Sequence, residues 1–203
     1  MEANTIYTVG YTAYDIEEFI TELKKYNITH VIDVRSNPFS QYYSDYNKNN
    51  LENKLRQNGM LYQNYNIEFG ARQSEKIYFS TNGYLDFSKF SKSEQFISGI
   101  NKVLEGIEQN YVFALMCAEK EPINCHRSIL VGREFHKIGI VVKHILSEGN
   151  ILLHSELEQQ LLERYFSNRE QINLFSEVKS EEELIEEAYA LSNAEIGYKE
   201  DSA

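Results

Sequence analysis

A group of reactive side chains lies in the segment Cys-Ala-Glu-Lys-Glu-Pro-Ile-Asn-Cys-His-Arg at residues 117–127. An apolar run ends at Cys117, and a helix is predicted to begin at Cys125. The free N–H groups and the positive dipole end of a helix N-terminus favour anions and lower the pKa of a thiol. We therefore expect Cys125 to be a candidate nucleophile, with Glu119 as a nearby carboxylate. The alternative interpretation is that both cysteines are small buried packing residues, the commonest fate of a free cysteine.

The same segment contains four side chains that are competent zinc ligands, namely Cys117, Glu119, Cys125 and His126. Structural zinc sites usually take cysteine pairs that are separated by about two to four residues. Seven residues separate the two cysteines here, so the spacing predicts no metal site. The sequence does not identify a cofactor.

A second polar group occurs in Val-Ile-Asp-Val-Arg-Ser at residues 31–36. Asp33 is expected to act as an acid-base or orienting carboxylate, and Ser36 to assist it. Arg35 and Arg127 carry guanidinium groups, which pair well with carboxylates and phosphates. Two such arginines at one site predict a negatively charged ligand. The alternative is that Asp33 and Arg35 form a pair that only holds the loop.

Both polar groups are positioned by a predicted alternation of strands and helices. Apolar or β-rich runs predict strands over residues 5–10, 30–34, 111–117 and 140–146. Helically spaced apolar residues predict helices over 16–23, 51–59, 96–107, 126–138 and 155–166. This alternation is typical of an α/β domain with a mainly parallel sheet flanked by helices, a Rossmann-like three-layer sandwich.

The carboxyl ends of parallel strands share one edge of the sheet, where ligands bind in open α/β folds. We therefore expect the two polar groups to meet at that edge and to face one hollow. Residues 70–92 show no regular period, which predicts a long excursion of the kind that forms lids or binding loops. Further ligand contacts are predicted at the strand ends for Gly10, Tyr11, Thr12, Cys117 and His126.

The composition predicts one domain with an appendage. The chain has 203 residues, of which 42% are hydrophobic, and we expect a single domain over 1–168 and an acidic extension, helical or disordered, over 169–203. Residues 177–203 contain nine acidic and two basic residues, so the rest carries only four of the eleven net negative charges. The near-neutral body is compatible with a nucleic-acid-derived ligand.

Membrane contact and export are not expected. The apolar runs are far shorter than the ~20 residues of a membrane span, and the first residues lack the basic and apolar regions of a secretion signal. Two cysteines are too few for a disulfide framework. The sequence therefore predicts a cytoplasmic protein with free thiols.

Several segments together resemble the bacterial and archaeal family called domain of unknown function 488. They are Tyr-Thr-Val-Gly-Tyr-Thr at 7–12, Val-Ile-Asp-Val-Arg-Ser-Asn-Pro-Phe-Ser at 31–40, Met-Leu-Tyr at 60–62, Phe-Gly-Ala-Arg at 69–72, Met-Cys-Ala-Glu-Lys-Glu-Pro-Ile-Asn-Cys-His-Arg at 116–127 and Val-Lys-His-Ile-Leu-Ser-Glu-Gly at 142–149. Two departures occur, because the family's Gly-His-Ser is Gly-Tyr-Thr at 10–12 and its Leu-Gly-Gly is Phe-Gly-Ala at 69–71. The resemblance implies a site built from these segments, and no particular reaction.

Residues 31–36 also resemble the aspartate-arginine strand of rhodaneses. A related phosphatase loop needs a cysteine, five intervening residues and then an arginine. Here arginine follows Cys125 at two and at eight residues, as Arg127 and Arg133. A rhodanese-like or phosphatase-like thiol enzyme is therefore a minor alternative.

The segment Gln-Ile-Asn-Leu-Phe at 171–175 looks like the short peptide with which bacterial DNA-repair and replication proteins bind the sliding clamp. In such peptides a glutamine, here Gln171, accompanies two apolar anchors, here Leu174 and Phe175, that enter a pocket. The alternative is that both apolar side chains pack on the domain's own surface.

Two hypotheses of different class follow. The leading hypothesis is an enzyme, or a ligand-binding domain derived from one, that acts on a phosphate-bearing, nucleotide-like or nucleic-acid-derived ligand. The other is a non-catalytic DNA-maintenance accessory that docks on the clamp through residues 171–175. The sequence leaves open whether the protein is an enzyme.

Overall fold

The architecture is a six-stranded sheet between two layers of helices, as predicted for an α/β three-layer fold. The computed structural model describes residues 4–167 and 179–199. The strands are β1 (Thr5–Gly10), β2 (His30–Asp33), β3 (Leu61–Asn64), β4 (Phe113–Cys117), β5 (Val141–Ile145) and β6 (Ile151–Leu153). They are ordered β3-β2-β4-β1-β5-β6, and only the pairing of β6 with β5 is antiparallel.

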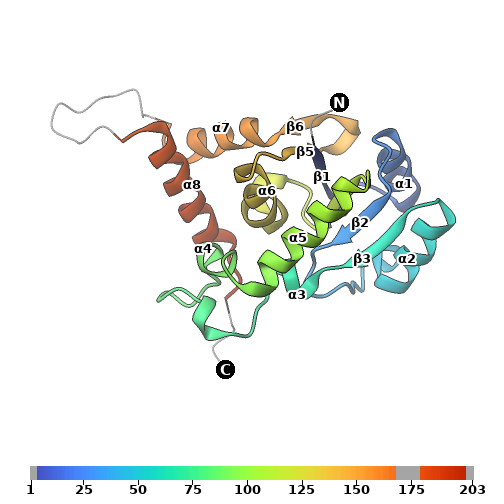
Figure 1. The fold of residues 1–203 in the computed structure, drawn as a ribbon, viewed down its shortest axis with the longest axis horizontal. Coiled ribbons are helices and arrows are strands. Elements are labelled where there is room, and N and C mark those ends of the chain that lie inside the picture. The colour runs from blue at the N-terminus through green and yellow to red at the C-terminus, as the bar shows by residue number, and fades with distance from the viewer. Residues whose placement is uncertain (1–3, 168–178, 200–203) are drawn as a thin grey trace.

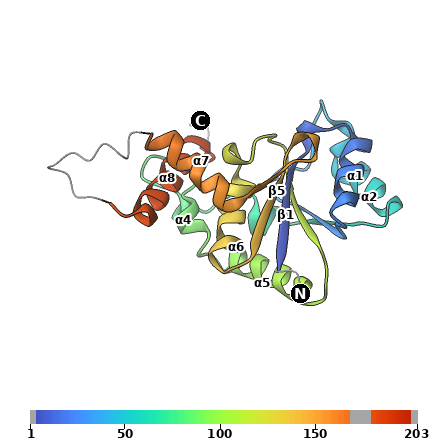
Figure 2. The ribbon, with the colours of Figure 1, turned by 90° about the horizontal axis from the view of Figure 1, so that it is seen from above.

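The helices are divided between the two faces of the sheet (Figures 1 and 2). One face is covered by α1 (Ile16–Lys25) and α2 (Lys48–Gln57), and the other by α5 (Glu94–Glu108), α6 (Arg133–Lys137) and α7 (His154–Tyr165). Three further helices are α3 (Asn66–Phe69), α4 (Phe87–Phe90) and α8 (Glu181–Ile196). Each face therefore has its own apolar core, as the burial of both faces of β4 requires.

Local sequence explains where several helices begin. Asp15 and Glu18 form a reciprocal capping box at the start of α1, and Ser180 with Glu183 does the same for α8. Ser93 caps α5 through the backbone N–H of Phe96. These caps satisfy N–H groups that have no partner within the helix.

Two segments differ from the sequence prediction. The predicted helix over 126–138 begins with a π-helical stretch, Arg127–Gly132, before α6. The excursion over 70–92 contains α4, whose Phe87 and Phe90 are buried in the core. The conformation of these segments therefore depends on packing between apolar side chains that are far apart in the chain. Local periodicity in the sequence does not reveal such packing.

The acidic extension contributes to the folded body. Its helix α8 packs beside α7 (Figure 1). Ala188 and Tyr189 of α8 are buried in the same core cluster as α5, α6 and α7. Within this extension, Glu181–Ile196 form the helix α8.

The chain leaves β1 and β4 toward opposite faces, since α1 and α6 lie on different sides of the sheet. Adjacent parallel strands whose connections diverge in this way open a crevice at their carboxyl ends. The register pairs Gly10 with Cys117 at that end. A Cβ atom on Gly10 would lie 1.9 Å from the carbonyl oxygen of Glu119, so glycine is needed for the two loops to approach.

Candidate functional site

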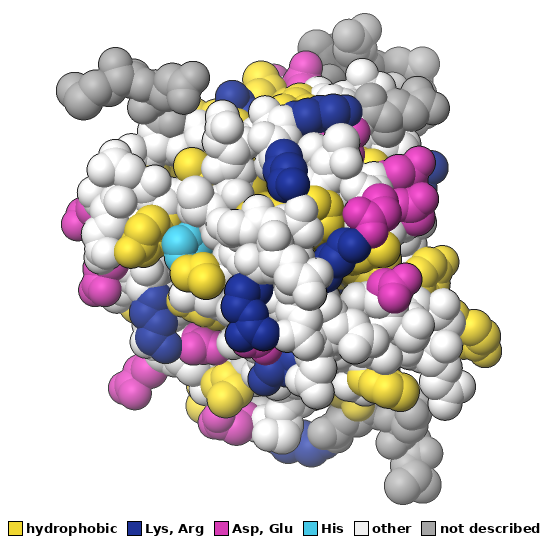
Figure 3. All heavy atoms as spheres, turned by 90° about the vertical axis from the view of Figure 1, so that its right-hand side faces the viewer, with side chains coloured by type: hydrophobic (Ala, Val, Ile, Leu, Met, Phe, Trp, Pro, Cys, Tyr) yellow, Lys and Arg dark blue, Asp and Glu magenta, His cyan; other side chains and the backbone are white. Residues whose placement is uncertain are grey.

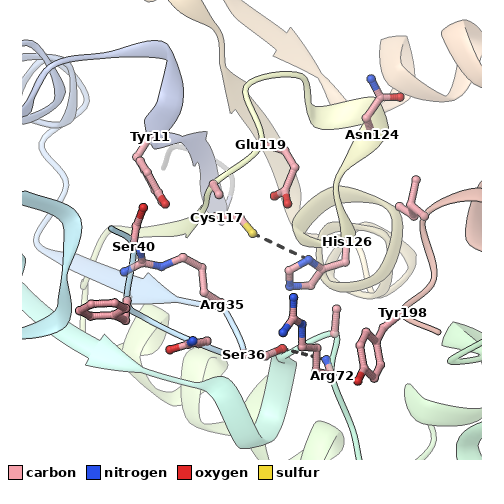
Figure 4. A pocket seen from close by; sticks show the side chains of 15 residues that line it. Tyr11, Arg35, Ser36, Ser40, Arg72, Cys117, Glu119, Asn124, His126 and Tyr198 are labelled. Carbon is pink, nitrogen blue, oxygen red and sulfur yellow. Dashed lines mark hydrogen bonds between the residues drawn. The ribbon is translucent and has the colours of Figure 1, made fainter. Parts of the chain in front are cut away.

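A cavity of about 430 Å³ lies at the carboxyl ends of β1, β2 and β4. Its wall includes six of the predicted site residues, which are Tyr11, Arg35, Ser36, Cys117, Glu119 and His126. Figure 4 shows their side chains around the cavity. The two polar groups therefore meet at one sheet edge, as expected.

Asp33 and Arg35 form a buried bidentate pair at the end of β2. Arg35 Nε donates to Asp33 Oδ1 at 2.9 Å, and Arg35 Nη2 donates to Oδ2 at 2.6 Å. The Tyr62 hydroxyl donates to the same Oδ2 at 2.7 Å. Asp33 is fully buried and is not on the cavity wall, so its carboxylate contacts Arg35 and Tyr62 and does not face the cavity.

Hydrogen bonds hold the Arg35 side chain in place, but one of its guanidinium nitrogens has no hydrogen-bond partner. Its Nη2 also donates to the carbonyl of Tyr46 at 2.8 Å, whereas Nη1 is buried without a hydrogen-bond partner. The guanidinium lies over the Tyr11 ring, with its carbon 5.0 Å from the ring centroid. Burial lowers the pKa of Arg35, but the hydrogen bonds and charge of Asp33 outweigh it and raise the pKa. A permanent cation therefore lies at the cavity wall.

Arg127 has a different position from the one predicted. It is fully buried and is not on the wall. Its guanidinium donates to the carbonyls of Glu119 at 2.6 Å and Lys120 at 3.2 Å, and its Nε to Thr8 Oγ1 at 3.3 Å. These hydrogen bonds hold the loop that follows β4 in place.

Two other residues that were predicted to contact the ligand stabilise the same loop after β4. The Thr12 hydroxyl donates to the carbonyl of Ala118 at 2.7 Å, and the Thr12 N–H donates to it at 3.2 Å. Gly10 allows the close backbone approach described above. Neither residue is on the cavity wall, and both hold the strand ends together.

Two thiols, an imidazole and a carboxylate form a compact cluster beside the cavity. Cys117 Sγ lies 3.8 Å from His126 Nδ1, and His126 Nε2 lies 3.0 Å from the carbonyl oxygen of Val34. The Cys125 thiol donates to Glu119 Oε2 at 2.9 Å. Both cysteines are buried, and only Cys117 is on the wall.

The cluster shifts the pKa values of its members in different directions. Burial raises the pKa of Cys117 well above its ordinary value. Burial also opposes ionisation of Cys125, but the Cys117 thiol and the Arg127 charge outweigh it and lower the pKa of Cys125 well below its ordinary value. Burial and the nearby Cys125 raise the pKa of Glu119. The pKa of the Cys125 thiol is therefore lowered and that of its hydrogen-bond partner Glu119 is raised.

Residues 15–133 match the model of the family described as domain of unknown function DUF488. The chain belongs to the DUF488 family. The match includes β2, β4 and the cysteine cluster. No curated protein matches the chain, and neither does any solved structure. Membership in DUF488 agrees with the resemblance seen in the sequence and assigns no activity.

This DUF488 chain also places on the wall residues that the sequence did not single out as site residues. Arg72 belongs to the Phe-Gly-Ala-Arg segment, and its N–H donates to Ser36 Oγ at 2.8 Å. Phe39 and Asn124 lie in the loops that follow predicted strands. Their position after a strand end could have indicated them as site residues. Tyr198 follows α8 and contacts the Arg72 guanidinium through its ring, at 5.3 Å from the centroid. No local pattern indicates such a distant contribution.

Two predictions about partners have different outcomes. No helix among residues 4–167 and 179–199 has the length and apolar character needed to cross a bilayer. The clamp-binding prediction rests on Gln171, Leu174 and Phe175, which lie outside the described residues.

Proposed function

We propose that the cavity binds a phosphate-bearing, nucleotide-like ligand. The observation that carries this proposal is the buried Nη1 of Arg35, which has no hydrogen-bond partner and belongs to a side chain on the cavity wall. An unsatisfied buried donor is costly, and a charged one more so. An anionic oxygen would satisfy it. Asp33 then acts as a positioning residue that holds the guanidinium in place.

Arg72 supplies a second cationic contact. Its guanidinium is part of the wall, and the structure gives it no acidic partner among the residues described. Its backbone is tied to Ser36, which lies next to Arg35 in the chain. Two guanidinium groups on one wall match the several oxygens of a phosphate, to which arginine binds in a bidentate manner.

Aromatic rings favour a ligand with a flat ring system beside its phosphate. Phe39 is 61% exposed although it is on the wall, and Tyr198 adds a further ring. Nucleobases stack on such side chains with a contribution of about 1–3 kcal/mol per base. The cavity volume of about 430 Å³ falls in the usual range for small-molecule sites.

The surface charge favours this small ligand over a DNA duplex. On the face that Figure 3 shows, basic side chains are interspersed with acidic ones. Duplex binding depends on a concentrated basic surface that neutralises several phosphates. The net charge of −11 points in the same direction. We therefore propose a mononucleotide-sized ligand, held at the strand ends.

Calorimetric titration with mononucleotides, nucleosides and inorganic phosphate tests the proposal. Arg72→Gln is expected to weaken mononucleotide binding about tenfold, because a charge-assisted hydrogen bond contributes about 1.5–3 kcal/mol. Phe39→Ala is expected to weaken mononucleotide binding while leaving phosphate binding unchanged. Arg56→Gln, at an exposed arginine of α2, is the matched control. Absence of binding at millimolar concentration, or equal losses in Arg56→Gln, would contradict the proposal.

A further inference from the structure

We propose that the cluster beside the cavity is a zinc site formed by Cys117, Glu119, Cys125 and His126. One ligand atom from each of these residues lies within 4.8 Å of all the others. Two thiols, an imidazole and a carboxylate form a donor set that is typical of zinc in proteins. This inference does not depend on the proposed anion ligand.

The geometry is close to that of a four-coordinate site. Zinc bonds of about 2.0–2.3 Å in a tetrahedron separate neighbouring ligand atoms by roughly 3.3–3.8 Å. Cys117 Sγ and His126 Nδ1 are 3.8 Å apart. Cys125 Sγ and Glu119 Oε2 are 2.9 Å apart, as a hydrogen-bonded pair, and would separate slightly as a metal replaces the shared proton. Small side-chain movements therefore suffice.

The groups around the cluster orient it for metal binding. His126 Nε2 lies 3.0 Å from the Val34 carbonyl, which can accept its proton and leaves the Nδ1 lone pair directed toward Cys117. Histidine ligands of metals almost always have such an outer partner. The N–H of Arg127 donates to Cys125 Sγ at 3.4 Å. This bond favours the thiolate, the form in which cysteine binds zinc.

The topology explains why sequence spacing predicted no metal. Cys117 is the last residue of β4, whereas Cys125 and His126 directly precede the π-helical stretch. The intervening loop returns to the strand end, where the Arg127 guanidinium holds its carbonyls. A loop closed in this way brings ligands together at a spacing that a zinc knuckle does not have. Three of the four ligand residues are on the cavity wall, so the metal would border the pocket (Figure 4).

Cobalt substitution of the tag-free, reduced full-length chain tests the site. Because the chain contains only two cysteines, thiolate-to-cobalt charge-transfer bands can come only from Cys117 and Cys125. We expect stoichiometric Co²⁺ binding with these bands and with the strong visible bands of a four-coordinate ion, and displacement of cobalt by Zn²⁺. Cys117→Ser and Cys125→Ser are each expected to weaken Zn²⁺ binding at least about tenfold in a competition with a chromophoric chelator.

Two controls separate ligand loss from other effects. Glu121→Gln changes a nearby carboxylate that is outside the cluster and is expected to retain wild-type Zn²⁺ affinity. The unaltered chain gives a readout that needs no variant, since Zn²⁺ should slow iodoacetamide alkylation of both thiols at least about tenfold. Cobalt bound without charge-transfer bands, or alkylation that Zn²⁺ leaves unchanged, would overturn the proposal whatever the nucleotide titration gives.

Discussion

Acid should destabilise this protein through a buried histidine pair that the site does not use. His144 Nε2 lies 3.1 Å from His154 Nδ1. The other ring nitrogen of His144, Nδ1, lies 2.8 Å from Thr8 Oγ1. The other ring nitrogen of His154, Nε2, lies 2.8 Å from the Tyr189 hydroxyl. Both histidines are buried. Burial lowers the pKa of His144 well below its ordinary value, and that of His154 to about 3. Both rings are therefore neutral in the native state near neutral pH.

The magnitude follows from proton linkage. An unfolded histidine has a pKa near 6.5, whereas His154 has a pKa of about 3 when folded. Between these values the unfolded chain binds more protons, so the free energy of unfolding falls as the pH falls. The contribution of His154 is complete above about pH 6.5. From pH 7.5 to 5.0 it should decrease by about 2 kcal/mol, and His144 acts in the same direction.

Urea unfolding at several pH values measures this contribution, with His154→Gln as the perturbation. The variant is expected to have a lower free energy of unfolding than the wild type at pH 7.5. Between pH 7.5 and 5.0, its free energy of unfolding should fall by about 2 kcal/mol less than that of the wild type. Tyr189→Phe is the matched control, because it removes a hydroxyl contact of His154 while the ring remains buried. Its pH dependence should follow the wild type. Identical pH dependence in His154→Gln and the wild type would refute the reasoning.

Three further outcomes are expected. Gly10→Ala should destabilise the fold by about 1–3 kcal/mol in urea unfolding, because its Cβ would lie 1.9 Å from a backbone oxygen of the loop after β4; a loss below about 0.5 kcal/mol would contradict that packing. Asp33→Asn should lower the free energy of unfolding by about 3–5 kcal/mol, since the Arg35 guanidinium would remain buried without its carboxylate partner. Unchanged thermal stability of this variant would argue against a strong ion pair. The hypothesis that residues 171–175 bind a sliding clamp predicts that Leu174→Ala combined with Phe175→Ala abolishes binding to an immobilised clamp, and wild-type binding by this double variant would exclude the motif.

The sequence by itself predicted four of the six strands and the sheet edge at which the two polar segments meet. Apolar runs ending at Gly10, Val34 and Cys117 predicted three strands whose carboxyl ends had to share one edge, because parallel strands align in this way. The polar segments that follow them therefore had to meet. Strands and helices could be predicted because each has its own spacing of apolar residues along the chain, and this spacing is visible in a single sequence.

Only the tertiary structure decided what each polar side chain contacts. Arg127 looks like an anion-binding residue in the sequence, but its guanidinium is buried against backbone carbonyls. Cys117 and His126 meet because a loop folds back on its own strand. Tyr198 reaches the cavity because α8 packs on the core. These contacts join residues through packing and hydrogen bonds between distant segments, and such pairings leave no periodic signal in the chain.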